Sequence, residues 1–196
     1  MRRSGVLLVL LALLGASSCG TRHAGPTDCR DYVASPAAHA ARLNGNAGAP
    51  TGEDYQYVCF AGVSRLAVVA YGLMAEKRSA NPAVRGLTER LVGDNKQAYA
   101  ELDGLARQQD GMVMPTRLDE EHVATRSQLS PLTGDAFDRA YLQLLIAEDQ
   151  EAIRLQHREL KGGEEPFLKR YAVNSLKRLQ GELASVQQVA AEIGAQ

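Results

Sequence analysis

The chain has 196 residues, with 22 lysines and arginines against 23 aspartates and glutamates, and a formal net charge of −1. This balance excludes a protein that binds nucleic acid or an acidic membrane through a basic surface, because such proteins carry an excess of positive charge. Aromatic residues make up 5% of the chain and tryptophan is absent. The core is therefore expected to consist of leucine, valine and alanine in helices.

The first eighteen residues are expected to be an export signal. Two arginines follow Met1, an apolar run extends from Gly5 to Leu14, and small residues fill positions 15–18. A positive start, an apolar stretch and small residues, in that order, are typical of a secretory signal. The apolar run is about half of the roughly 20 residues that span a bilayer. The sequence therefore predicts a protein of the bacterial cell envelope, in the periplasm.

Cys19 follows the small residues directly. The stretch that it ends resembles the lipobox of bacterial lipoproteins, although Ala16 stands where leucine is usual. The resemblance implies that Cys19 carries lipid, which would make the membrane a partner and place the protein at the outer membrane. The alternative is an ordinary cut near Ala16 to Ser18, which would leave Cys19 as a plain thiol.

Cys29 and Cys59 are the other cysteines of the chain. If Cys19 carries lipid, they form an even pair in an oxidising compartment, where disulfides persist. A bridge between them would close a loop of about 30 residues and stabilise the fold by roughly 3–4 kcal/mol. The alternative is two separate buried thiols, because free cysteine behaves as a small hydrophobic residue.

Proline, glycine and asparagine divide the rest of the chain into a lead-in and one domain. Residues 19–52 have few large apolar side chains and are expected to form a tether, and residues 53–194 are expected to form an all-α four-helix bundle. Apolar residues at helical spacing predict four long helices, with a short helical piece in the connector between the second and third. The predicted spans are Tyr55 to Ser79, Pro82 to Gln109, Asp119 to Leu129, Asp135 to Leu160 and Glu165 to Ile193.

Four polar residues interrupt the apolar faces near the helix midpoints: Asn95, Glu148, Asp149 and Glu182. Midpoints fall at one level in such a bundle, so these side chains could form a polar layer. Bundle cores are also where carboxylate metal sites are built. However, the chain has no Glu-x-x-His motif, and the first helix offers only Val68, Val69 and Ala70 at that level. We expect a structural layer, with Arg178 satisfying Glu182, and keep a metal site as the alternative.

No motif of a phosphate loop, a Cys-x-x-Cys pair or a His-Glu-x-x-His zinc site occurs in the chain. The sequence therefore predicts no catalytic residue and no definite cofactor. A third possibility is a small-molecule carrier, with a cavity beside Val68 and Ala70 where larger side chains are missing.

From Phe60 to Val189 the chain resembles a bacterial envelope family, domain of unknown function 4142. The resemblance rests on Gly72-Leu73-Met74-Ala75, on Ser79 to Val84, and on Leu91-Val92-Gly93-Asp94. Glu101-Leu102, Gly134, Phe137-Asp138 and Ala140-Tyr141 extend it. The resemblance implies an exported protein with a ferritin-like bundle.

This chain departs from the family at the positions where metal ligands are expected. The family usually shows histidine where Asn95, Asp149 and Glu182 stand, and an acidic residue in the first helix where Val68 or Ala70 stands. We therefore expect a non-enzymatic, lipid-anchored envelope protein with a structural, stress-related or interaction role. A metal-binding or redox bundle with a degenerate site is the alternative.

Overall fold

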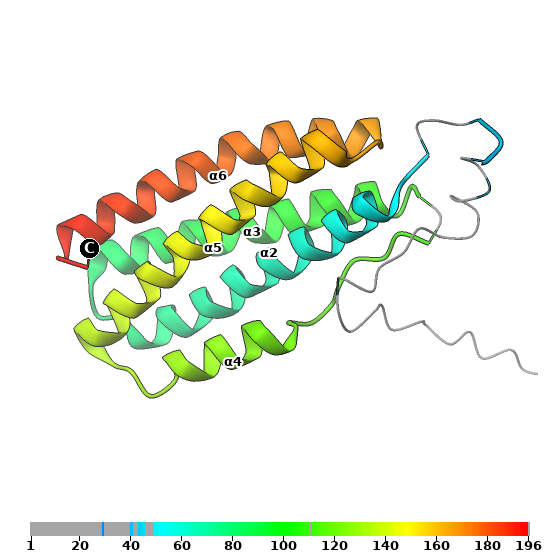
Figure 1. Cartoon of the computed structure of the whole chain (residues 1–196). Helices are drawn as coiled ribbons and strands as arrows, with labels where there is room; N and C mark the ends of the chain where they lie inside the picture. Colours follow the sequence, from blue (N-terminus) through cyan, green and yellow to red (C-terminus); the bar gives the residue numbers. More distant parts are fainter. Residues whose placement is uncertain (1–28, 30–39, 41–42, 46–48, 110, 196) are drawn as a thin grey trace, which may run out of the picture.

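The computed structural model describes Cys29, Ala40 and residues 43–45, 49–109 and 111–195. Four long helices lie side by side in it, and a short fifth helix runs along one edge (Figure 1). The helices are α2 (Gly52–Arg78), α3 (Pro82–Ala106), α4 (Glu120–Leu129), α5 (Gly134–Gly162) and α6 (Pro166–Glu192). No strand occurs within these described residues. The predicted all-α bundle with a helical connector is confirmed.

Capping residues start three of the helices where the sequence places them. Thr51 and Asp54 form a reciprocal capping box at the start of α2, which satisfies backbone N–H groups that have no partner within the helix. Asn81 accepts from the backbone of Ala83 and Val84 and precedes Pro82. Asp119 accepts from the backbone N–H of His122 at 2.9 Å. These local bonds fix where α2, α3 and α4 begin.

The connection through α4 sets the layout of the bundle. The chain runs along α2, returns along α3, crosses back through α4, and then follows α5 and α6 (Figure 1). Contacts join α2 to α3 and α5, and α6 to α3 and α5. Neighbouring long helices are therefore antiparallel, and one long crossover separates the two helical pairs, as in ferritin-like folds.

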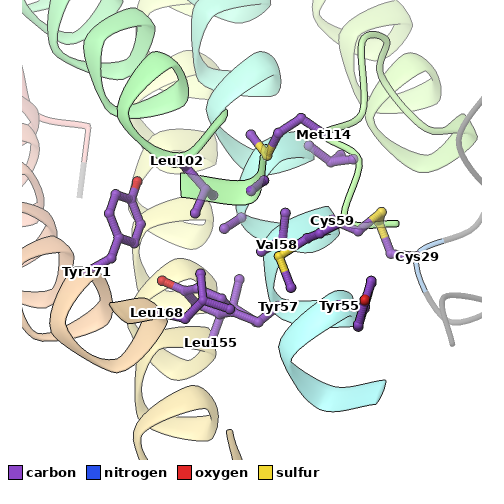
Figure 2. Close-up of a cluster of buried hydrophobic side chains, with 14 of the residues drawn as sticks. Cys29, Tyr55, Tyr57, Val58, Cys59, Leu102, Met114, Leu155, Leu168 and Tyr171 are labelled. Atoms are coloured by element: carbon purple, nitrogen blue, oxygen red, sulfur yellow. A yellow bond between two sulfur atoms is a disulfide. The ribbon is translucent and has the colours of Figure 1, made fainter. Parts of the chain in front are cut away.

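The core consists of two apolar clusters along the axis of the bundle. One contains Cys59, Leu102 and Leu168, with the side chains shown in Figure 2. The other contains Tyr141 and Val186. On each long helix the two clusters leave a gap near the midpoint, and polar residues fill these gaps.

Helix α2 is the most buried of the long helices. By length and composition it could cross a membrane, but most of its apolar stretch is buried inside the bundle. Helical spacing alone would place Leu73 on the inward face of this helix, but it is 42% exposed. Tyr71 and Gly72 take the adjoining buried places instead.

Candidate functional site

Arg65 of α2 lies at the centre of the bundle and is only 3% exposed. Its Nη1 donates to Oδ1 of Asn95 on α3 at 2.9 Å, and its Nη2 donates to Oγ of Ser175 on α6 at 2.8 Å. The Glu182 carboxylate, also on α6, lies 3.8 Å from Nη1. One guanidinium therefore links three helices, and hydrogen bonds to charged groups contribute about 1.5–3 kcal/mol each.

Asp149 brings the fourth long helix, α5, into the same layer. Burial and the neighbouring Glu182 raise the pKa of the Asp149 carboxyl to about 8, although Arg65 opposes the shift. Burial also raises the pKa of Glu182, and Arg65 again opposes it. Asp149 is thus mainly protonated at neutral pH. We call Arg65, Asn95, Asp149, Ser175 and Glu182 the central polar layer.

The structure brings three of the four predicted midpoint residues together. Asn95, Asp149 and Glu182 belong to the central polar layer, whereas Glu148 lies on a different face of α5 and lines a cleft. The expectation that α2 presents an apolar wall at this level is wrong, because Arg65 lies one turn before Val68.

Arg178 also differs from its predicted role. It donates to Glu101 at 2.7 Å, and its guanidinium lies over the ring of Tyr171. The hydrogen-bonded cation of the layer is therefore Arg65, and Arg178 acts on Glu182 only through its charge.

Within the part of the chain that the structure describes, no group of three or more histidine, cysteine, aspartate or glutamate side chains could hold a metal ion. The side-chain oxygen of Asn95 is already an acceptor for Arg65. Its amide nitrogen donates to the Leu91 carbonyl at 3.0 Å. Both polar atoms of the Asn95 side chain therefore have partners within the protein.

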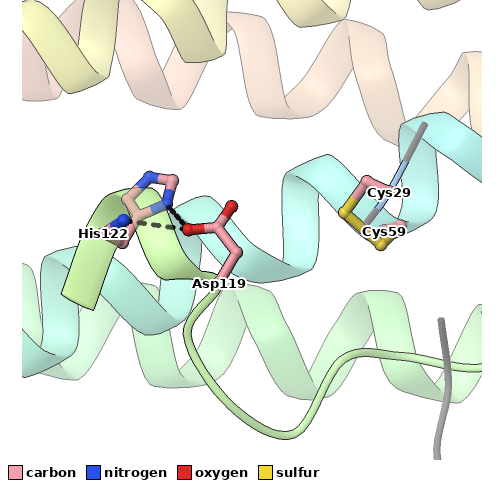
Figure 3. Close-up of a disulfide and its surroundings, with 4 residues drawn as sticks. All are labelled: Cys29, Cys59, Asp119 and His122. Atoms are coloured by element: carbon pink, nitrogen blue, oxygen red, sulfur yellow. Dashed lines mark hydrogen bonds and ion pairs between the residues drawn. A yellow bond between two sulfur atoms is a disulfide. The ribbon is translucent and has the colours of Figure 1, made fainter. Parts of the chain in front are cut away.

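A second polar cluster lies outside the core, where α4 begins. Nδ1 of His122 contacts Oδ1 of Asp119 at 2.5 Å, and its Nε2 lies 3.5 Å from Glu148 on α5. Figure 3 shows the His122 ring turned toward Asp119. Burial lowers the pKa of His122, but the bonds to Glu148 and Asp119 outweigh it and raise this pKa to about 9. The charged imidazole therefore holds α4 to α5.

A cleft of about 920 Å³ opens beside this cluster, between α4, α2 and α5. Its apolar part is formed by Phe60 and Leu144, and its polar part includes Glu148 and Glu151. The carrier hypothesis placed a cavity beside Val68 and Ala70 instead. Val68 is 4% exposed within a core cluster, and neither residue lines this cleft.

Cys29 and Cys59 form a disulfide with their Cα atoms 5.4 Å apart (Figure 3). Both residues are buried in the first apolar cluster (Figure 2). This bond attaches the lead-in to α2, and it is the pairing that the cysteine count favours. Cys19 lies outside the described residues, so its lipidation stays a prediction.

A buried carboxyl pair lies near the same end of the bundle. Asp54 accepts from the backbone N–H groups of Glu164 and Glu165, both at 3.0 Å, and so joins α2 to the start of α6. Glu159 of α5 is 2% exposed, and burial, followed by Asp54, raises the pKa of Glu159 to about 8. Glu159 therefore carries a proton at neutral pH.

Comparison with known families fits this architecture. A family model, "Domain of unknown function (DUF4142)", matches residues 38–189. The chain belongs to the DUF4142 family. The match begins upstream of the first helix of the bundle, at a point earlier than the resemblance in the sequence suggests. No curated protein matches this DUF4142 chain.

Two solved structures share the fold of this DUF4142 protein. A DUF305 fragment from Deinococcus radiodurans is 18% identical, with a TM-score of 0.65 over 73% of this chain and 98% of that chain. A DUF305 protein from Streptomyces coelicolor, described as a "putative secreted protein", is 16% identical, with a TM-score of 0.58 over 74% of this chain and 93% of that one. At these identities the similarity shows the helical fold alone.

Arg65 is the residue that sequence reasoning missed. Between Asp54 and Glu76 it is the only charged residue. A single charge in a long apolar helix, opposite helices that carry acidic residues at their midpoints, is the signal that could have identified it. Ser175 gives no comparable signal, because serine is equally common on the surface of helices.

Proposed function

We propose that this DUF4142 protein is an exported, non-catalytic bundle of the cell envelope, held at the membrane by lipid on Cys19, with a structural or interaction role. The buried position of Arg65 is the observation that supports the non-catalytic part of this proposal. Ferritin-like bundles build metal sites between the midpoints of their helices. Here that space contains a guanidinium whose positive charge repels a second cation.

The polar layer has a structural explanation that needs no ligand. A buried charge is costly unless it is paired and hydrogen-bonded, and Arg65 has Asn95, Ser175 and Glu182 as partners. Buried polar residues can also fix the register of packed helices. A layer that joins α2, α3, α5 and α6 at one level would prevent them from sliding along one another.

Three observations support export. Residues 1–18 have the order of a secretory signal, Cys29 and Cys59 form a disulfide, and the neighbour from Streptomyces coelicolor carries a description of secretion. Disulfides persist mainly in oxidising compartments. Lipidation of Cys19 is consistent with the pairing, because the remaining two cysteines are bonded to each other.

Fractionation of a bacterium that expresses the full chain tests the location. We expect the protein in the envelope membrane fraction, with a mature N-terminus at an acylated Cys19 by mass spectrometry. Cys19→Ala should lose the lipid and leave the membrane fraction. An unmodified start at Ser17, Ser18 or Cys19 would refute the anchor, and a cytoplasmic protein with its first residues intact would refute export.

Metal analysis of the purified protein tests the non-catalytic role. We expect less than stoichiometric transition metal, unchanged by Glu182→Ala. Stoichiometric metal that is lost in Glu182→Ala but kept in Glu101→Ala would contradict the structural role. Glu101 is a suitable control because it lies on the surface and pairs with Arg178.

A further inference from the structure

The cleft beside α4 exists because α4 is too short to cover its neighbours. At 1.5 Å per residue, the ten residues of α4 extend about 15 Å, whereas the 29 residues of α5 extend about 43 Å. Helix α4 therefore covers only part of the groove between α2 and α5. The uncovered part is the cleft of about 920 Å³, a size typical of small-molecule sites.

One wall of the cleft is apolar. Phe60 of α2 and Leu144 of α5 pack against the two different core clusters, and the cleft lies across the gap between these clusters. Leu155 and the small side chains of Ala147 and Ala152 complete this wall. A hydrocarbon group placed there would remove apolar surface from water, at about 25 cal/mol per Å².

The cleft is also lined by acidic side chains, from the start of α4 and from α5. Its five carboxylates face two basic side chains, so the cleft carries an excess of negative charge; the carboxylates are Asp119, Glu120, Glu121, Glu148 and Glu151, and the basic residues are His122 and Arg158. Both basic groups are engaged, because His122 lies between Asp119 and Glu148 and Arg158 pairs with Glu151. Glu151 also pairs with Arg154. Among the described residues, the lining carboxylates without an ion pair are therefore Glu120 and Glu121, in the first turn of α4.

We propose that this cleft binds a small amphipathic organic cation, with its ammonium group toward Glu120 and Glu121 and its hydrocarbon part against Phe60 and Leu144. The proposal rests on charge complementarity combined with an apolar wall of matching size. It specifies the interaction role proposed above, but it depends on neither export nor lipidation. Binding to purified protein therefore tests it separately from the location of the protein.

Calorimetric titration of the full-length mature protein is the test, with decyltrimethylammonium as the probe below its micellar concentration. We expect one molecule to bind per chain. Decyl sulfate, which has the same tail and the opposite charge, and tetramethylammonium, which has the same head and no tail, should each bind at least about tenfold more weakly. A tenfold change corresponds to about 1.4 kcal/mol. Equal binding of decyl sulfate, or no binding of the cation, would overturn the proposal.

Two variants place the ligand in the cleft. Ala147→Trp puts a large side chain into the space and should abolish binding, whereas Ala184→Trp, at an exposed position of α6, should not change it. Glu120→Gln with Glu121→Gln should weaken binding of the cation and leave the weak binding of decyl sulfate unchanged or improved. Thermal unfolding of each variant shows that it is folded. Binding that survives Ala147→Trp in a folded protein would place the ligand elsewhere and refute the site.

Discussion

Arg65 on α2 and Asn95 on α3 are joined by a buried hydrogen bond of 2.9 Å between Nη1 and Oδ1. Asn95 at the same time donates to the carbonyl of Leu91, one turn before it in its own helix. The asparagine is thereby fixed in orientation, with its oxygen toward α2. The guanidinium in turn reaches Ser175 and Glu182 on α6, so stability in the middle of the bundle depends on this one side chain.

Replacing Arg65 by methionine should therefore be strongly destabilising. The substitution leaves Glu182 and the oxygen of Asn95 buried without their partner, and breaking a buried ion pair from one side costs about 3–5 kcal/mol. Urea unfolding measures the effect. Arg154→Met is the control, because Arg154 pairs with Glu151 on the surface, where such pairs contribute about 0–1 kcal/mol.

A second substitution should restore part of this loss. With Glu182→Gln added to Arg65→Met, the side chain opposite the missing arginine is no longer charged, so the double variant should be more stable than Arg65→Met alone. An Arg65→Met protein as stable as the parent would contradict the structural role of the central polar layer.

The free energy of unfolding should fall as the pH rises from about 4 to about 8. Asp149 and Glu159 have folded-state pKa values of about 8, whereas free carboxyls titrate near 4. The folded protein therefore holds protons that the unfolded chain has released in this range. Each group should contribute a slope of about −1.4 kcal/mol per pH unit between its two pKa values. The stabilisation is present in full below about pH 4 and is lost above about pH 8.

Urea unfolding at a series of pH values between 5 and 8 measures this slope. Asp149→Asn and Glu159→Gln, which cannot titrate, should each flatten it. Glu192→Gln, at an exposed position near the end of α6, should leave it unchanged. A stability that increases with pH over this range would show that the two buried carboxyls are ionised in the folded protein.

Removal of the disulfide should destabilise the bundle without unfolding it. The bond closes a loop with a sequence separation of 30 residues, for which the loss of chain entropy predicts roughly 3–4 kcal/mol. We expect Cys29→Ala with Cys59→Ala to lower the unfolding free energy by that amount, with the helical circular dichroism signal retained at 25 °C. Unchanged stability in this double variant would mean that the bond does not form in the protein.

Replacing glycine by alanine should have opposite effects on stability at two positions in neighbouring helices. A methyl group added at Gly72 would collide with Cγ2 of Val92, and valine is stiff at χ1, so Gly72→Ala should cost about 1–3 kcal/mol. Nothing lies within 4 Å of the corresponding position at Gly93. Gly93→Ala should therefore stabilise α3 by about 0.8–1.0 kcal/mol, and thermal unfolding compares the two. The same sign in both variants would contradict the close approach of α2 to α3.

Sequence periodicity was sufficient for the helices, because their apolar faces repeat at helical spacing and Thr51, Asn81 and Asp119 mark their beginnings. It also placed Asn95 and Asp149 in the core. Periodicity could not place Arg65, since an arginine on a helix is usually solvated and only the acids and amides of three other helices make its burial favourable. The direction of Glu148 was equally hidden, because a one-residue difference from Asp149 decides which side of α5 it faces.

The cleft could not be predicted for a different reason. It depends on the length of α4 relative to α5 and on where the crossover places α4 against the bundle. In the sequence, the acidic residues of α4 look like the first-turn acids that favour the start of many helices. The contact of His122 with Glu148 shows that this turn faces α5.

The bond between Cys29 and Cys59 also determines where a mechanical load would enter the bundle. A pull applied anywhere before Cys29 would reach the fold through the sulfur atoms at Cys59, about two turns inside α2. The 29 residues between the two cysteines would carry none of that tension. The N-terminal end of α2 would therefore not unfold one turn at a time. The force would act on the packed side chains of the first apolar cluster, which would have to separate together.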